Sequence, residues 1–227
     1  CGEIQVLQSV IDKLDIRQSA REVTRGNDLL PPRSEDGVGG ELSNRFAQLL
    51  QSRIERSRYE PFPASFVYVP KQHHATRPAA LLNLADRVIL HALVGSLRLR
   101  IEQRLLGLDI VFWPRGIESD KRWRDIEASP LKADVTHVVV ADITAYYESI
   151  DHELLCEPLI QSTGKRHEVN ALIWILGHVM GRSRGIPQGL QCSDQLATAY
   201  MSDIDAFMSR NCPHYSRHGD DIRIGVS

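Results

Sequence analysis

The chain has 227 residues, of which 42% are hydrophobic and 25% are charged, and its formal net charge is −2. This composition is that of an ordinary globular protein, and no apolar run approaches the roughly 20 residues of a membrane-spanning helix, so we expect no membrane contact and a cytoplasmic location. The four cysteines form no CxxC pair, which argues against a disulfide framework or a structural zinc site. The sequence opens on cysteine and stops soon after the start of a predicted strand, so we interpret it as a fragment.

The small net charge conceals an uneven distribution along the chain. Residues 41–124 carry 14 Lys/Arg against 8 Asp/Glu, whereas residues 125–227 carry 8 against 14. Lys and Arg contact phosphate groups, and carboxylates bind hard cations, so this division favours a phosphate-binding region beside a cation-binding one. Chance segregation of solvated surface charges is the alternative.

The N-terminal part of the chain is predicted to be helical. Apolar residues recur at helical spacing over residues 7–14 and again, after the Pro- and Gly-rich segment 31–40, over residues 42–54. The next segment, SFVYVP (65–70), alternates in the manner of a β-strand.

A long helix is predicted from about Ala79 to Leu106, starting just after Pro78. Within it, Asp86 and Arg87 are interpreted as a local interaction on the helix surface. The β-branched run THVVVAD (136–142) is predicted to be a buried central strand.

The C-terminal part mixes helices with a hairpin. Two helices are predicted between Glu153 and Met180, followed by the GIPQG loop, a helix from about Asp194 to Met208, and a closing antiparallel hairpin. Strands separated by helices, with a hairpin at the end, favour an α+β fold over a helical bundle.

Two adjacent aspartates, Asp220 and Asp221, stand in the closing segment HYSRHGDDIRI. Adjacent carboxylates repel each other, and a divalent cation converts that repulsion into attraction. A tight turn at Gly219, Asp220 and Asp221 would present both carboxylates at a hairpin tip, because glycine gives the backbone the freedom that such a turn needs. Taken alone, the pair is more simply interpreted as a solvated Asp-rich loop.

Asp142 supplies a third carboxylate. It ends an apolar strand and would therefore stand at the rim of the sheet, where the hairpin tip also arrives. Converging carboxylates suit a two-metal site, in which cations about 3.5–4 Å apart stabilise the attacking and leaving oxygens of a phosphoryl displacement.

Four segments resemble motifs of reverse transcriptases and occur in the order that these enzymes have them. ADITAYYESIDHELL (141–155) is similar to motif A, GIPQGLQCS (185–193) to motif B, and YSRHGDD (215–221) to motif C. Upstream, VPKQHHATRPAALLNLADRVILHAL (69–93) is similar to the fingers segment of bacterial and group II intron reverse transcriptases. The resemblance covers the chain from about residue 65 to its end.

The resemblance implies a right-hand polymerase whose antiparallel palm sheet packs on helices. The parts expected from it are a helical N-terminal extension (1–60), fingers (61–133) and a palm truncated at its C-terminal end (134–227), with the thumb absent. It implies an RNA-directed DNA polymerase that adds deoxynucleotides to a DNA or RNA primer on an RNA template. The HGDDIRI spelling resembles bacterial defence-associated, abortive-infection-like enzymes, with a group II intron or retron relative as the alternative.

The resemblance also assigns the catalytic roles. Asp142, Asp220 and Asp221 would be the catalytic carboxylates. The metal ligands would be these three side chains and the carbonyl oxygen of Ile143, and the expected cofactor is Mg²⁺, as two ions, with Mn²⁺ as a possible substitute.

Five further residues match positions that bind the incoming nucleotide in this family. Lys71 and Arg77 match the fingers residues that grip the triphosphate, a role suited to an ammonium and a guanidinium group. Gln188 and Gly189 match the loop that lines the sugar and the base pair. Tyr147 matches the bulky residue beneath the ribose, whose ring leaves no room for a 2′-hydroxyl, so deoxynucleoside triphosphates are the expected substrates.

Two other classes of function stay open from the sequence. GDD is also the motif C spelling of viral RNA-dependent RNA polymerases. Those enzymes resemble one another in having a carboxylate near the position of Tyr147, and this chain has no carboxylate there. The second class is a non-catalytic nucleic-acid-binding module derived from a polymerase. It is favoured by His218, which stands where the family has Tyr or Phe, and by the missing thumb. The neighbouring Tyr146 is predicted to lie in the core.

Overall fold

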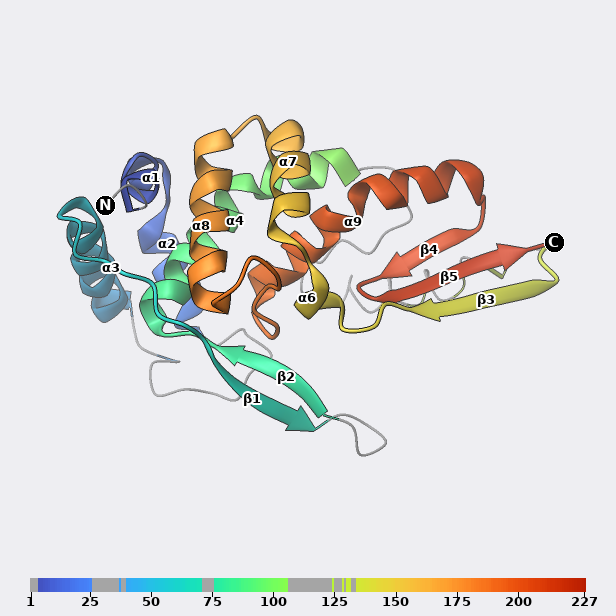
Figure 1. Ribbon diagram of the computed structural model, residues 1–227, viewed down its shortest axis with the longest axis horizontal. Coiled ribbons are helices and arrows are strands. Elements are labelled where there is room, and N and C mark those ends of the chain that lie inside the picture. Colours follow the sequence, from blue (N-terminus) through green and yellow to red (C-terminus); the bar gives the residue numbers. More distant parts are fainter. Residues whose placement is uncertain are drawn as a thin grey trace.

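The computed structural model describes residues 4–25, 37, 40–70, 76–105, 124, 128, 130, 131 and 134–227. Helices make up most of the described chain, and two small antiparallel sheets project from them (Figure 1). The predicted α+β class is confirmed, whereas the division into an extension, fingers and a palm stays a prediction. Within the described ranges, no helix is long and apolar enough to span a membrane.

The N-terminal region consists of short helices around a turn. Its elements are α1 (Ile4–Gln8), η1 (Ile11–Lys13), α2 (Ile16–Val23) and α3 (Gly40–Glu55). The continuous helix predicted over residues 7–14 is wrong, because Leu14 adopts an extended backbone and the next helix starts afresh. Asp15 begins that helix by accepting a hydrogen bond from the backbone N–H of Gln18 at 2.9 Å.

A β-hairpin precedes the longest helix. Strand β1 (Ser65–Pro70) pairs antiparallel with β2 (Thr76–Leu81), and α4 (Leu84–Leu105) follows. The helix predicted to start near Ala79 therefore starts five residues later. The side chain of Asn83 accepts a hydrogen bond from the Asp86 N–H at 2.9 Å and donates one to the Asp86 carboxylate at 2.7 Å. This reciprocal cap fixes the helix start.

Asp86 and Arg87 are buried, so their interpretation as a surface pair is wrong. Besides Asn83, the Asp86 carboxylate accepts hydrogen bonds from the Tyr59 hydroxyl at 2.5 Å and the Phe62 N–H at 3.0 Å. Asp86 thereby joins the chain before β1 to the start of α4.

Four helices form the body of the molecule: α4, α7 (His152–Thr163), α8 (Arg166–Met180) and α9 (Gln191–Asn211). The first part of α4 is buried on every side from Val88 to Leu90, which is typical of a central helix. The two helices predicted between Glu153 and Met180 are confirmed, and the helix predicted over 194–208 is longer at both ends.

The three-stranded sheet has the order β3–β5–β4, formed by His137–Asp142, Asp221–Val226 and Tyr215–His218. Burial falls across it: Tyr215 to Arg217 of β4 are buried, most of β5 is half-buried, and every residue of β3 is exposed. The prediction of a buried central strand at β3 is therefore wrong. A β-branched run indicates a strand, but only the pairing shows that β3 lies at an edge and β5 in the centre.

Candidate active site

Asp142 and Asp221 lie directly opposite each other where β3 ends and β5 begins. Opposed residues of an antiparallel pair point to the same face, with their Cβ atoms about 4.5–5.5 Å apart. The N–H of Ile143 donates a hydrogen bond to the carbonyl oxygen of Asp220 at 3.1 Å. The structure thus brings the backbones of Asp142, Ile143, Asp220 and Asp221 together at the end of the sheet that faces the helical body (Figure 1).

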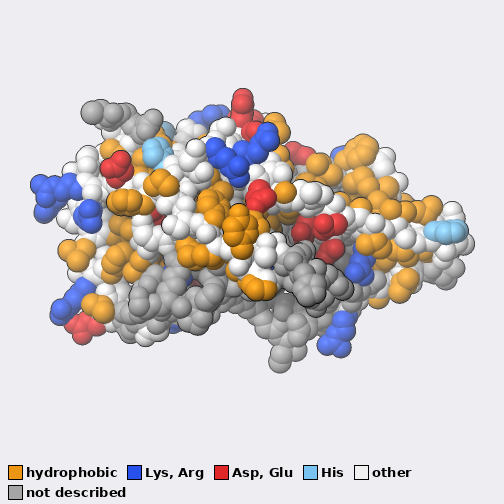
Figure 2. All heavy atoms as spheres, turned by 60° about the horizontal axis from the view of Figure 1, so that its bottom comes forward, with side chains coloured by type: hydrophobic (Ala, Val, Ile, Leu, Met, Phe, Trp, Pro, Cys, Tyr) orange, Lys and Arg blue, Asp and Glu red, His pale blue; other side chains and the backbone are white. Residues whose placement is uncertain are grey.

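The hairpin tip is a two-residue turn of Gly219 and Asp220, and Asp221 is the first residue of β5. Gly219 has φ +60° and Asp220 does not have a positive φ, which is the pattern of a type II′ turn. Asp220 and Asp221 are half-buried, whereas Asp142 is exposed. Figure 2 views the molecule with the bottom of Figure 1 turned forward, and it shows acidic side chains gathered near the middle of that face, between the helical body and the sheet.

The chemistry of these donors fits magnesium. Like charges directly opposite each other destabilise a sheet, so the pairing of Asp142 with Asp221 favours a cation between them. In the described part of the chain, no three His, Cys, Asp or Glu side chains form a group that could hold a metal by themselves. Magnesium is commonly bound through one or two carboxylates together with water and substrate phosphates, which is the mode that this pair can provide.

Helix α6 (Tyr146–Ser149) follows Asp142 and carries two tyrosines with different roles. Tyr146 is 4% exposed and donates a hydrogen bond to the Ala197 carbonyl, so the prediction that it lies in the core is confirmed. Tyr147 is half-buried, and its hydroxyl donates to the Asp194 carboxylate at 2.6 Å. Burial, and then the charge of Asp194, raise the pKa of Tyr147, which keeps the phenol neutral.

Asp194 is a neighbour of the candidate site that the sequence did not reveal. The sequence placed it only at the start of a predicted helix, and nothing in its spacing from Tyr147 indicates a contact across 47 residues. The structure shows that Asp194 fixes the position of the Tyr147 ring.

The loop at residues 181–190, which lies between α8 and α9 in the chain, is hydrogen-bonded to both α6 and the β1–β2 hairpin. The N–H of Ile186 donates to the Tyr147 carbonyl at 2.9 Å, and the Gln188 carbonyl accepts from the Ala80 N–H of β2 at 3.0 Å. Gly189 has φ +101°, a conformation that favours glycine. Gln188 and Gly189 are half-buried between the two elements.

The two predicted phosphate-binding residues have different outcomes. Arg77 is exposed on β2, opposite Val69 and three residues before Ala80. It is thus carried by the hairpin that adjoins the loop and not by the sheet that carries the carboxylates. Lys71 lies outside the described residues.

His218 faces Asp221 across the β4–β5 pair. Burial lowers the pKa of His218, although the negative charges of Asp221 and Asp220 act in the opposite direction. The imidazole beside the carboxylates is therefore kept neutral over most of the physiological pH range.

Comparison with known proteins shows a distant similarity and does not assign the chain to a family. The chain is similar to Protein YkfC of Escherichia coli (strain K12), with 23% identity over 171 residues. The match covers 71% of this chain and 45% of that protein, so the chain spans less than half of its relative's length. No family model matches the sequence.

Proposed function

We propose that the protein is an RNA-directed DNA polymerase that transfers deoxynucleotides to a primer 3′-hydroxyl. The observation that carries the proposal is the register of β3 and β5. It places Asp142 opposite Asp221, with Asp220 in the adjoining turn, although the segments are about 80 residues apart. Like charges directly opposite each other destabilise a sheet, and a cation or a cationic ligand between the two carboxylates would remove that cost.

The surroundings of the carboxylates support a polymerase over other phosphoryl-transfer enzymes. The Tyr147 ring, held by Asp194, would exclude a ribose 2′-hydroxyl. The loop with Gln188 and Gly189 would line the base pair, since its backbone is bonded to both α6 and β2. Arg77, on the same hairpin, would bind triphosphate oxygens.

The reaction would be attack of the primer 3′-hydroxyl on the α-phosphate, with a new P–O bond formed and pyrophosphate leaving. Magnesium, once bound, would supply Lewis-acid stabilisation of the attacking and leaving oxygens. The chain's own contribution would be positional: Asp142, Asp220 and Asp221 would hold the cation, Tyr147 would select the sugar, and Arg77 would orient the leaving group.

Primer extension on an RNA template tests the proposal. Replacing both Asp220 and Asp221 by Asn should lower the rate of deoxynucleotide addition by at least about a thousandfold, because the cation ligands are lost. The matched control is Asp134→Asn. That exposed carboxylate contacts His214 at the opposite end of the same sheet, and its loss should leave the rate unchanged. Equal extension by the double variant and the control would refute the proposal.

The choice between the sugars is tested separately. Tyr147→Ala should raise incorporation of ribonucleotides relative to deoxynucleotides by about tenfold or more, since the steric block is removed. If the unaltered protein already prefers ribonucleotides, an RNA-dependent RNA polymerase replaces the proposal. If the unaltered protein extends no primer and binds no Mn²⁺, a non-catalytic nucleic-acid-binding module replaces the proposal.

A further inference from the structure

A buried ion pair lies beneath the hairpin tip and has no part in the proposed chemistry. The side chains of Arg217 on β4 and Asp205 on α9 are 1% and 0% exposed. Burial of two charges is costly unless both are paired and hydrogen-bonded. What the pair contacts therefore indicates what it does.

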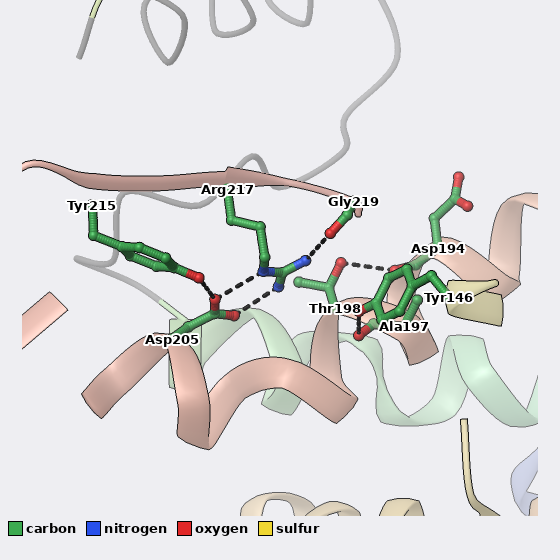
Figure 3. Close-up of polar contacts among 8 residues, drawn as sticks. All are labelled: Tyr146, Asp194, Ala197, Thr198, Asp205, Tyr215, Arg217 and Gly219. Atoms are coloured by element: carbon green, nitrogen blue, oxygen red, sulfur yellow. Dashed lines mark hydrogen bonds and ion pairs between the residues drawn. The ribbon is translucent and has the colours of Figure 1, made fainter. Parts of the chain in front are cut away.

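The ion pair is bidentate: two N–H groups of Arg217 bond the two carboxylate oxygens of Asp205 (Figure 3). Arg217 donates from Nε to one Asp205 oxygen at 2.8 Å and from Nη2 to the other at 2.6 Å. The Tyr215 hydroxyl donates to the first of these oxygens at 2.5 Å. The guanidinium plane is thus fixed to helix α9.

The third arm of the guanidinium reaches the turn. Arg217 Nη1 donates to the carbonyl oxygen of Gly219 at 2.5 Å, as Figure 3 shows. This carbonyl belongs to the peptide group that joins Gly219 to Asp220. Helix α9 therefore sets the orientation of that peptide group through Asp205 and Arg217.

The next peptide group is held from the other side. The carbonyl of Asp220 accepts the hydrogen bond from the Ile143 N–H of the chain that follows β3. Both peptide groups that flank the Asp220 Cα are therefore bound, which fixes the backbone dihedrals of Asp220 and the direction of its Cα–Cβ bond.

We propose that Arg217, held by Asp205, is a positioning residue that sets the direction in which the Asp220 carboxylate side chain leaves the backbone. Beyond the two bonds to Asp205, the bond to Gly219 is the additional feature, because it acts on the turn itself. The effect on metal binding rests on the proposed function, whereas the effect on the turn does not.

Amide hydrogen exchange at Ile143, measured by NMR, reports the turn directly. Arg217→Lys keeps one positive charge for Asp205 but cannot reproduce the three-donor fork, so exchange at Ile143 should rise about tenfold or more. Tyr215→Phe removes a bond to Asp205 that does not reach the turn and should leave this exchange unchanged. Asp86→Asn is the matched stability control, since Asp86 is also buried and bonded to a tyrosine hydroxyl at 2.5 Å.

A second variant covers the case in which Arg217→Lys does not fold. The double variant Arg217→Met with Asp205→Leu removes both charges, a replacement that is often neutral for stability, and should show the same faster exchange at Ile143. Unchanged exchange in whichever folded variant is measured would overturn the proposal.

Mn²⁺ binding, followed by electron paramagnetic resonance, separates this proposal from the proposed function. Arg217→Lys should weaken Mn²⁺ binding about tenfold, and Tyr215→Phe should not. Faster exchange at Ile143 in a protein whose unaltered form binds no Mn²⁺ would support the positioning role and contradict the polymerase. Faster exchange with unchanged Mn²⁺ binding would overturn the link from the turn to the Asp220 carboxylate.

Discussion

The helical body and the three-stranded sheet are stabilised in different ways. The main hydrophobic cluster takes residues from the N-terminal helices, the β1–β2 hairpin and helices α4, α6, α7, α8 and α9, but none of its buried members belongs to β3, β4 or β5. Side chains of β4 are instead joined to α9 by hydrogen bonds, and those that the structure describes all go to Asp205. The three valines of β3 are exposed.

This difference explains where a cation site can be placed. A tightly packed apolar core would impose a high desolvation cost on carboxylates, whereas an exposed strand end keeps them hydrated until a cation binds. The charged network under β4 can hold such a strand end in position without covering it. This difference predicts that the stability of the sheet depends on a few residues, whereas the stability of the body is spread over many.

Loss of Asp205 should have the largest effect on stability. Asp205→Ala leaves Arg217 buried without its counter-charge, and we expect a loss of about 3–5 kcal/mol in the free energy of unfolding, measured by urea denaturation. Asp203→Ala is the control on the same helix. The Asp203 side chain is 62% exposed in its ion pair with Arg104, so its loss should cost at most about 1 kcal/mol. Equal costs would show that the sheet is held by something other than this network.

A pair of apolar truncations sharpens the contrast. Leu172, in the middle of α8, is 0% exposed, and Leu172→Ala should cost about 2–5 kcal/mol because it leaves a cavity in the body. Val140, in the middle of β3, is 67% exposed, and Val140→Ala should change the free energy of unfolding by about 0.5 kcal/mol or less. A cost at Val140 that approached the cost at Leu172 would mean that β3 is covered in solution.

The site was predictable where local sequence determines it. Asp142 ends an apolar run, and a glycine precedes Asp220 and Asp221, so a strand end and a hairpin tip could both be expected and their meeting inferred. The outer position of β3 was not predictable, because β-branched residues suit edge and central strands alike. Asp194 and Asp205 were missed for another reason: their partners are reached only through the packing of α9.

The start of α4 gives the corresponding lesson for the fold. The helix was predicted to start near Ala79 because proline is common at helix starts, but residues 79–81 pair with β1, and this pairing overrides the signal of Pro78. The signal that could have corrected the boundary is the reciprocal cap of Asn83 and Asp86, which marks a helix start three residues after Leu81.

The smallest predicted effect concerns the attachment of the loop at residues 181–190 to the helical body, and it depends on pH. His152 opens α7, is 3% exposed and donates from Nε2 to the Gly185 carbonyl at 2.6 Å, which ties the loop to the body. Burial lowers the pKa of His152 below its ordinary value of 6.5.

Below pH 6.5 the unfolded chain therefore binds a proton at His152 more readily than the folded chain does, so the contribution of this residue to stability is present above that pH and is lost as the pH falls toward the folded pKa. His152→Gln keeps an N–H donor for Gly185 but does not titrate. Its free energy of unfolding, measured by urea denaturation from about pH 7 to pH 5, should fall less than that of the unaltered protein. A His152→Gln slope equal to that of the unaltered protein would show that the loop's attachment to the body does not depend on a neutral imidazole.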